Sequence, residues 1–272
     1  MTTYDFIEQR ARWGALLKTQ LCIVAALVRR EMRAHFGESR MGYLWALLEP
    51  GLHLAAYLLL FTYVLVRKPG LGTSPMLFFM TGIIPYFLYS KVGIYTSGAV
   101  SGNRPLLTLP PVKLHDVIVA RTVLEAATYF FVGVIVFSGL YVGGVAAAVP
   151  NDALRVMEAS GLAILIGVGV GMINLVITAY FHNWMTFFGF LSMPLWFFSG
   201  IFYLPEHVPE PFRDYLLYNP LVHIVLIYRM GFYQDFKPAL LDTPYAVAFA
   251  IVVFAFGLAA VRVARRQILA PV

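Results

Sequence analysis

Charged residues and cysteine are scarce in this chain of 272 residues, and both shortages restrict the class of protein to which it can belong. Only 12% of the residues are charged, about half the share in a typical soluble domain, whereas 60% are apolar. The single cysteine, Cys22, excludes an intramolecular disulfide, so the compartment must be inferred from topology. The composition excludes an ordinary soluble domain and predicts a membrane protein.

Motifs for nucleotide binding, metal binding and hydrolysis are also missing. There is no G-x-x-x-x-G-K-[ST] loop, no H-E-x-x-H spacing and no G-x-S-x-G elbow. We therefore expect no catalytic residue, metal site or cofactor in this chain. The net charge of +6 lies mostly beside apolar runs, where basic residues orient a membrane protein, so we do not expect nucleic acid as a partner.

Apolar windows predict an all-α integral membrane protein with six transmembrane helices. A helix of about 20 apolar residues is long enough to cross the hydrocarbon core of a bilayer. The predicted spans are 41–66, 76–100, 116–142, 154–181, 185–203 and 245–263. An even number of spans places both termini on one side, and most Lys and Arg flank the spans on that side. This bias predicts that both termini are cytoplasmic.

Residues 1–40 and 204–244 do not fit as spans. The first segment places apolar residues at helical spacing among basic ones, which predicts an amphipathic helix at the cytoplasmic interface, acting as an anchor or also touching a partner. The second contains six prolines between short apolar pieces. It predicts re-entrant half-helices forming a gate on the outer face, with a plain loop as the alternative.

Isolated charges inside the spans are expected to face the protein interior, because a charge in lipid is costly. Lys91 and Glu125 are predicted at similar depth on successive helices. Two interpretations stay open: a structural ion pair between them, or Lys91 lining a path for an anionic substrate. Gly167 and Gly171 form a small-xxx-small pattern that predicts close packing of two helices.

Aromatic residues are dense in the second and fifth predicted spans. Flat aromatic rings with polar tips can contact the faces of sugars without selecting a sequence, much as aromatic side chains stack on any nucleobase in single-strand-binding proteins. Ordinary packing is the alternative. The residues that we predict to line a substrate canal are Tyr57, Tyr86, Tyr89, Lys91, Trp196 and Phe197.

Several segments together resemble the ABC-2 type polysaccharide export permeases, most closely the capsular polysaccharide permeases of Gram-negative bacteria. The segments that carry the resemblance are LVRREMRAHFGESRMGYLWALLEPGLHL from Leu27, GIIPYF at 82–87, LPPVKLHDVIVAR at 109–121, MPLWFFSGIFYLPEHVP at 193–209 and YNPLVHIVLIYR at 218–229. The resemblance covers nearly the whole chain in order and spacing.

This resemblance implies a homodimer whose six-helix domain, residues 41–266, sits in the inner membrane. It implies a separate dimeric ATPase, which binds ATP and Mg²⁺, and a lipid-linked capsular polysaccharide as cargo. A periplasmic co-polymerase and an outer-membrane exporter would continue the path. It also implies that the loop 101–115 couples to the ATPase and that 204–244 forms periplasmic gate helices. We assign Arg104, Pro110, Pro111, Lys113 and His115 to coupling, and Arg29, Arg30, Arg33 and Arg40 to the interface helix.

Other functions remain as alternatives. Within the permease class, export of O-antigen or teichoic acid-type polymers is the nearest one, and drug export is a further option. A membrane-embedded transferase would need a polar catalytic cluster, which the spans lack. A secondary transporter often shows an internal repeat, and 41–142 does not resemble 154–263 convincingly.

Overall fold

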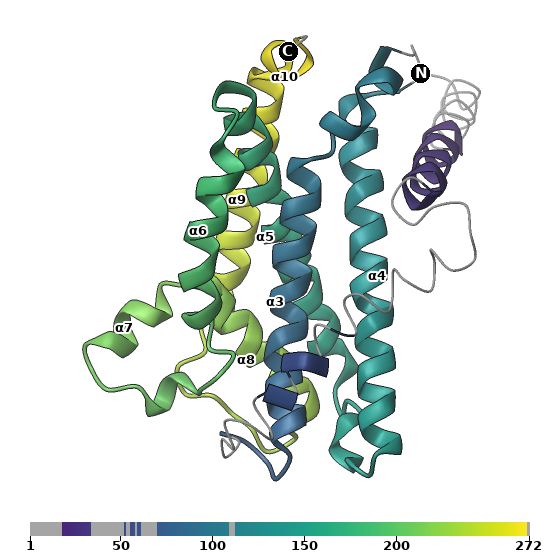
Figure 1. Cartoon of the computed structure of the whole chain (residues 1–272). Coiled ribbons are helices and arrows are strands. Elements are labelled where there is room, and N and C mark those ends of the chain that lie inside the picture. The colour runs from purple at the N-terminus through teal and green to yellow at the C-terminus, as the bar shows by residue number, and fades with distance from the viewer. Residues whose placement is uncertain are drawn as a thin grey trace, which may run out of the picture.

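The computed structural model describes residues 18–33, 52, 55–57, 59, 60, 70–108 and 112–270. Over these ranges the chain is helical with no strand (Figure 1). Four helices in them are long and apolar enough to cross a bilayer: α3 (Pro75–Ser97), α4 (Leu114–Val142), α5 (Ala153–Tyr180) and α9 (Thr243–Val263). They confirm four of the predicted spans. The predicted span 41–66 lies largely outside the described residues.

The fifth predicted span is shorter than expected. Helix α6 runs from Trp184 to Phe197, which is 14 residues, whereas the sequence predicted 185–203. The chain leaves the helix because Gly200 has φ of +71°, a left-handed conformation that glycine adopts without steric cost. The segment 198–204 therefore turns back toward the protein instead of continuing the helix.

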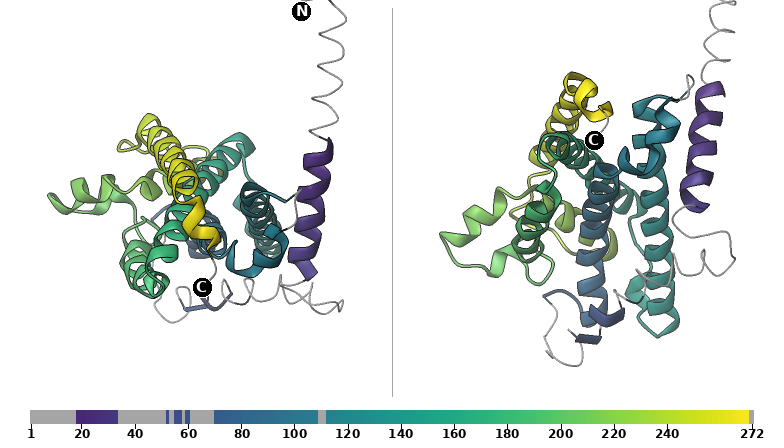
Figure 2. Two further views of the ribbon diagram at one scale, coloured as in Figure 1. Left: turned by 90° about the horizontal axis from the view of Figure 1, so that it is seen from above. Right: turned by 45° about the horizontal axis from the view of Figure 1, so that its top comes forward.

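The two ends of the bundle differ in character. The helix 18–33, the 3₁₀ segment η2 (Ser101–Thr108) and the short helix α10 (Arg265–Leu269) lie at one end, which we call the basic end (Figure 1). The opposite end carries η3 (Ala146–Ala148), η4 (Pro205–His207), α7 (Phe212–Leu217) and α8 (Pro220–Phe232). Two views from other directions show the helix 18–33 beside α4 (Figure 2).

Helix α5 packs between α3 and α9, and glycines make both contacts possible. A Cβ at Gly167 would lie 2.6 Å from the Tyr89 carbonyl oxygen, and one at Gly171 would lie 2.6 Å from the Gly93 carbonyl oxygen. The predicted close packing at these two positions is confirmed. On the other face of α5, a Cβ at Gly257 of α9 would lie 2.7 Å from the Gly169 carbonyl oxygen. Small residues thus bring three helix backbones together, as is typical in membranes.

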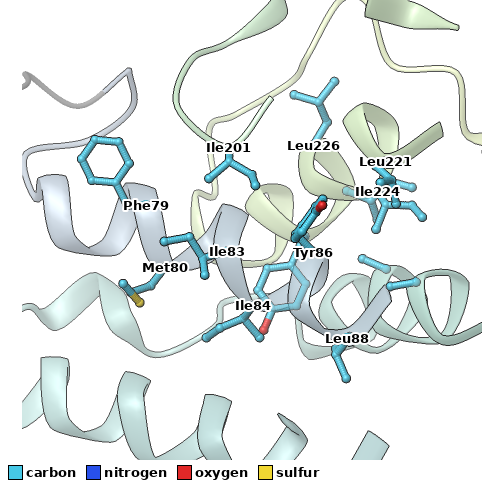
Figure 3. Close-up of a cluster of buried hydrophobic side chains, with 14 of the residues drawn as sticks. Phe79, Met80, Ile83, Ile84, Tyr86, Leu88, Ile201, Leu221, Ile224 and Leu226 are labelled. Carbon is cyan, nitrogen blue, oxygen red and sulfur yellow. The ribbon is translucent and has the colours of Figure 1, made fainter. Parts of the chain in front are cut away.

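The proline-rich stretch 204–244 contains the short helices α7 and α8 instead of a span. Pro220 occupies the first turn of α8, where its missing N–H costs nothing, and the Asn219 side chain caps that turn by accepting from Leu221 N–H. Most of the 13 residues of α8 are buried. Figure 3 shows Leu221, Ile224 and Leu226 of α8 with Ile201 beside the α3 side chains.

Candidate functional site

An aromatic cluster around Trp196 is the first candidate site. The Trp196 ring lies 4.7 Å from that of Tyr86, 5.4 Å from Tyr57 and 5.5 Å from Phe87, measured between centroids. Phe202 lies 5.7 Å from Trp196 and 5.8 Å from Phe197. Edge-to-face and tilted contacts of this kind stabilise aromatic groups beyond simple burial.

All six residues predicted to line a canal belong to this cluster or touch it. Tyr89 joins through Tyr86, with centroids 5.8 Å apart. Lys91 joins through Phe87, because its ammonium nitrogen lies 5.8 Å from that ring centroid. The sequence did not single out Phe87 and Phe202 as canal residues, although both stood among the aromatics of the same two spans. Contact alone does not make these side chains a canal, so that role stays a prediction.

The cluster has polar groups within an apolar setting. Tyr86 and Tyr89 are buried, and the Tyr86 hydroxyl donates to the Ser192 carbonyl at 3.3 Å across to α6. Phe197 is 55% exposed, so the cluster extends from the packed interior to the surface of α6. Such a surface offers ring faces and a few hydroxyl groups to a ligand.

An ion pair between Lys91 and Glu125, one of the two interpretations left open by the sequence, does not form. Both residues are described, and none of the ion pairs among described side chains joins them. Helices α3 and α4 instead meet where the Thr96 and Thr122 hydroxyls lie 3.4 Å apart. Thr96 and Lys91 are five residues apart, or about 140° around a helix, so they lie on different faces of α3. Glu125 is buried, as expected for a charge inside a span.

An apolar cavity lies between α3, α4, α5 and α8. It measures about 500 Å³ and is bordered by Ile84, Tyr129, Phe137, Val156 and Phe232 among others. Few polar groups line this cavity. Because a sugar needs hydrogen-bond partners for its hydroxyl groups, the cavity suits apolar material better than a polysaccharide.

A buried arginine on α8 is the second candidate site, and the sequence did not predict it. Arg229 is fully buried, and its guanidinium donates to the carbonyls of Gly200 at 2.9 Å and Ile201 at 2.8 Å. It also lies over the Phe78 ring of α3, 4.0 Å from the centroid. Gly82 allows this approach, since a Cβ there would lie 3.0 Å from the Ile201 Cα and 3.3 Å from an Arg229 nitrogen. Arg229 thus fastens the turn after α6 to α3 and α8.

Two further polar side chains lie buried near this arginine. The Glu206 carboxylate acts on the charge of Arg229, and neither of its oxygens has a hydrogen-bond partner among the described residues. The Tyr233 hydroxyl is likewise buried without one. Burial raises the pKa of Tyr233 to about 12, so this hydroxyl keeps its proton at neutral pH. No ion pair within 4 Å joins Arg229 to Glu206 among the described residues.

A polar network at the basic end is the third candidate site. Glu31 of the helix 18–33 is buried and pairs with Arg121 of α4 at 2.8 Å. The Asn103 amide in η2 donates to Glu31, and its carbonyl oxygen accepts from Arg30. Gln20 donates to the buried Asp116 of α4. These contacts join the helix 18–33, η2 and α4.

The residues assigned to coupling and to the interface helix fall in different places around this network. Arg30 takes part in it, whereas Arg29 is exposed and donates to Ala25 within its own helix, and Arg33 is exposed. Arg104 donates to the Ala270 carbonyl at 3.1 Å, which ties η2 to the C-terminal segment. Lys113 and His115 are exposed at the start of α4. Arg40, Pro110 and Pro111 lie outside the described residues.

The apolar residues of the helix 18–33 are of two kinds. Leu27 is buried against the ends of α3 and α4, whereas Leu21 is 68% exposed. Over the described ranges, no group of three His, Cys, Asp or Glu could hold a metal ion.

Comparison with known proteins places these features in context. Residues 23–233 match the family model described as ABC-2 type transporter. The chain is 33% identical over 245 residues to the polysialic acid transport protein KpsM of Escherichia coli, covering 90% of this chain and 94% of KpsM. It is 26% identical over 249 residues to the capsule polysaccharide export inner-membrane protein CtrC of Neisseria meningitidis, covering 90% and 92%. It is 35% identical over 86 residues to the O-antigen export system permease protein RfbA of Myxococcus xanthus, which is 32% of either chain.

Proposed function

The chain belongs to the ABC-2 type transporter family as an inner-membrane permease subunit, and we propose that it exports a lipid-linked capsular polysaccharide. The observation that carries this proposal is similarity to KpsM and CtrC along nine-tenths of the chain. Subunits of this kind are not catalytic, and the chain has no nucleotide-binding motif. A separate ATPase dimer would bind ATP and Mg²⁺ and supply the energy.

The aromatic cluster supports a polysaccharide as the cargo. Ring faces tolerate any sugar that presents a flat apolar side, and tyrosine hydroxyls add hydrogen bonds without fixing a sequence. The apolar surface of α6 next to the cluster would let a polymer slide. In this proposal Tyr57, Tyr86, Tyr89, Trp196 and Phe197 contact the polymer, and Lys91 attracts its anionic groups.

The polar network at the basic end supports coupling to the ATPase. The positive-inside bias orients this end toward the cytoplasm, where an ATPase would dock. Glu31, Asn103 and Arg121 join the helix 18–33 to η2 and α4. A displacement of the helix 18–33 or of η2 by the ATPase would therefore be transmitted directly to the transmembrane helix α4. At the opposite end, the turn 198–204 with α7 and α8 would form the periplasmic gate.

Helix α6 supports a homodimer with six helices in each subunit. None of its 14 residues is buried, and Phe190 is 71% exposed. A helix of this length is short for a lipid-facing span, so we place a second copy of the chain against it. Cysteine substitution at Phe190 in a Cys22→Ser background tests this contact. Oxidative cross-linking between two copies supports the dimer, and no cross-link at any position along α6 contradicts it.

The experiment that tests the function is a deletion strain scored for surface capsule. We expect capsule to disappear from the surface and lipid-linked polymer to accumulate inside, and plasmid-borne expression should restore export.

Co-purification with a co-expressed ATPase tests whether the chain is a permease subunit, and a stable complex of two permeases with two ATPases is expected. Continuation of the path by a periplasmic co-polymerase and an outer-membrane exporter follows from the resemblance and is testable by cross-linking in cells.

Export of O-antigen is the second candidate, because RfbA shares 35% identity with this chain. That similarity covers 32% of the chain, against 90% for the capsule proteins, so capsule export is the better supported cargo. The same deletion strain separates the two: loss of O-antigen with normal capsule would favour this alternative. Export of a teichoic acid-type polymer has no relative among these proteins to support it.

A further inference from the structure

Four basic side chains surround a small cavity at the basic end, between the start of α4 and the end of α9. Lys113, His115, Arg262 and Arg265 line it together with Leu114, and its volume is about 210 Å³. All four basic residues are exposed, and none forms an ion pair with a described carboxylate. We propose that this cavity binds the phosphate headgroup of an anionic phospholipid from the cytoplasmic leaflet.

The one carboxylate in the first turn of α4 does not neutralise the cavity. Asp116 is buried, accepts from Gln20 on the helix 18–33, and accepts from the Lys113 backbone N–H at 2.9 Å. The Asp116 carboxylate therefore interacts with donors on the side of α4 that faces the protein interior and not with the four basic side chains of the cavity. The cavity keeps a net positive charge that an anion would balance.

The helix faces below the cavity favour a lipid over a free anion. His115 heads a row at i, i+4 spacing on α4 that continues through Val119 and Val123, both nearly half exposed. Arg262 occupies the same position on α9 above Leu258 and Ile251, which are also exposed. His115 and Arg262 thus each end an exposed apolar stripe, so a headgroup in the cavity could rest its acyl chains on the stripes.

The position of the cavity agrees with this occupant. Helices α4 and α9 are both long and apolar enough to cross the membrane, and the cavity lies where α4 begins and α9 ends. Basic pockets between transmembrane helices on the cytoplasmic side attract acidic headgroups. The bound lipid would cross-brace two helices that have few direct contacts with each other. This inference does not depend on which polymer the protein exports.

Native mass spectrometry of the purified permease tests the proposal. The probes are phosphatidylglycerol, phosphatidylcholine and inorganic phosphate, each titrated into delipidated protein in detergent. We expect retention of phosphatidylglycerol over phosphatidylcholine. The Arg262→Gln/Arg265→Gln variant should retain phosphatidylglycerol roughly tenfold less well, because each basic residue near the surface adds to the attraction. The Arg262→Lys/Arg265→Lys variant should retain most of it.

The matched control is Arg266→Gln, which removes an exposed arginine of α10 that does not line the cavity. This variant should bind phosphatidylglycerol like the wild type. Equal retention of the two phospholipids, or full retention by the Arg262→Gln/Arg265→Gln variant, would overturn the proposal. Displacement of the lipid by inorganic phosphate at equal concentration would point to a free-anion site instead. Loss of ATPase binding with unchanged lipid retention would identify the cavity as a protein contact.

Discussion

The guanidinium of Arg229 on α8 stacks on the ring of Phe78 on α3, 4.0 Å from its centroid, with both side chains fully buried. The same guanidinium donates to carbonyls of the turn that follows α6. One side chain therefore holds together three segments that are far apart in the sequence. A buried charge is retained in an apolar region only if such partners compensate for its lost hydration.

We predict that Arg229→Lys destabilises the protein and reduces export. Lysine has no planar fork to stack on Phe78 while reaching two carbonyls. Each buried carbonyl left without a donor costs about 1–3 kcal/mol. The melting temperature of the purified protein and the surface capsule should both fall. The control is Arg213→Lys, because Arg213 pairs with the exposed Glu210 at the same end. An unchanged melting temperature in Arg229→Lys would contradict the role assigned to the stack.

The Glu31–Arg121 pair gives a second prediction. Removing one partner of a buried ion pair leaves an uncompensated charge and costs about 3–5 kcal/mol, whereas removing both can cost much less. We expect Glu31→Leu and Arg121→Leu each to lower the melting temperature and the yield of ATPase complex. The double variant should be more stable than the sum of the two single effects implies.

The stability control for this cycle is Arg29→Leu, which removes an exposed arginine that contacts only its own helix among the described residues. Its melting temperature should stay close to that of the wild type. If the effects of Glu31→Leu and Arg121→Leu simply add, the two residues do not act as a pair and the network does not couple the helix 18–33 to α4.

The four long spans α3, α4, α5 and α9 could be predicted from the sequence, because a long apolar run is stable only when it is buried in protein or lipid. The end of α6 could not, since the turn at Gly200 depends on where Arg229 and Gly82 hold the following segment. Depth along a helix was also misleading. Lys91 and Glu125 were expected at matching heights, but height says nothing about the direction in which a side chain leaves its helix.

The candidate sites show the same division. The six predicted canal residues were chosen for their type and depth, and the structure places them in one connected group. Arg229 was not singled out, because its partners in the turn after α6 and on α3 lie 26 or more residues away in the chain. The Glu31–Asn103 contact spans 72 residues and had no local signal. Long-range polar contacts of this kind need the fold before they can be recognised.

A third prediction concerns the glycine contacts of α5. We expect Gly171→Leu to prevent stable folding, because its Cβ alone would lie 2.6 Å from the Gly93 carbonyl oxygen and 2.7 Å from the Thr96 Cβ. The Gly93 carbonyl belongs to the backbone of α3 and cannot move away cheaply. The amount of protein in the membrane and its elution profile in detergent measure the effect. Gly161→Leu is the matched control on the same helix, because nothing lies within 4 Å of a Cβ there. Equal loss in both variants would show that helix propensity or lipid contact, not close packing, limits folding.

The last prediction distinguishes two roles of Trp196 in the aromatic cluster, contact with the polymer and packing of the protein interior. If Trp196 contacts the polymer, Trp196→Phe should keep a ring face and much of the export, whereas Trp196→Ala should reduce surface capsule at least tenfold. The melting temperature reports the packing contribution, since truncating a large aromatic side chain costs up to about 3–5 kcal/mol in a core. Phe256→Ala on α9 controls for loss of an exposed aromatic ring, because Phe256 is 62% exposed and belongs neither to the cluster nor to α6. An export defect that Trp196→Ala shows only together with a proportional loss of folded protein would assign Trp196 to packing alone.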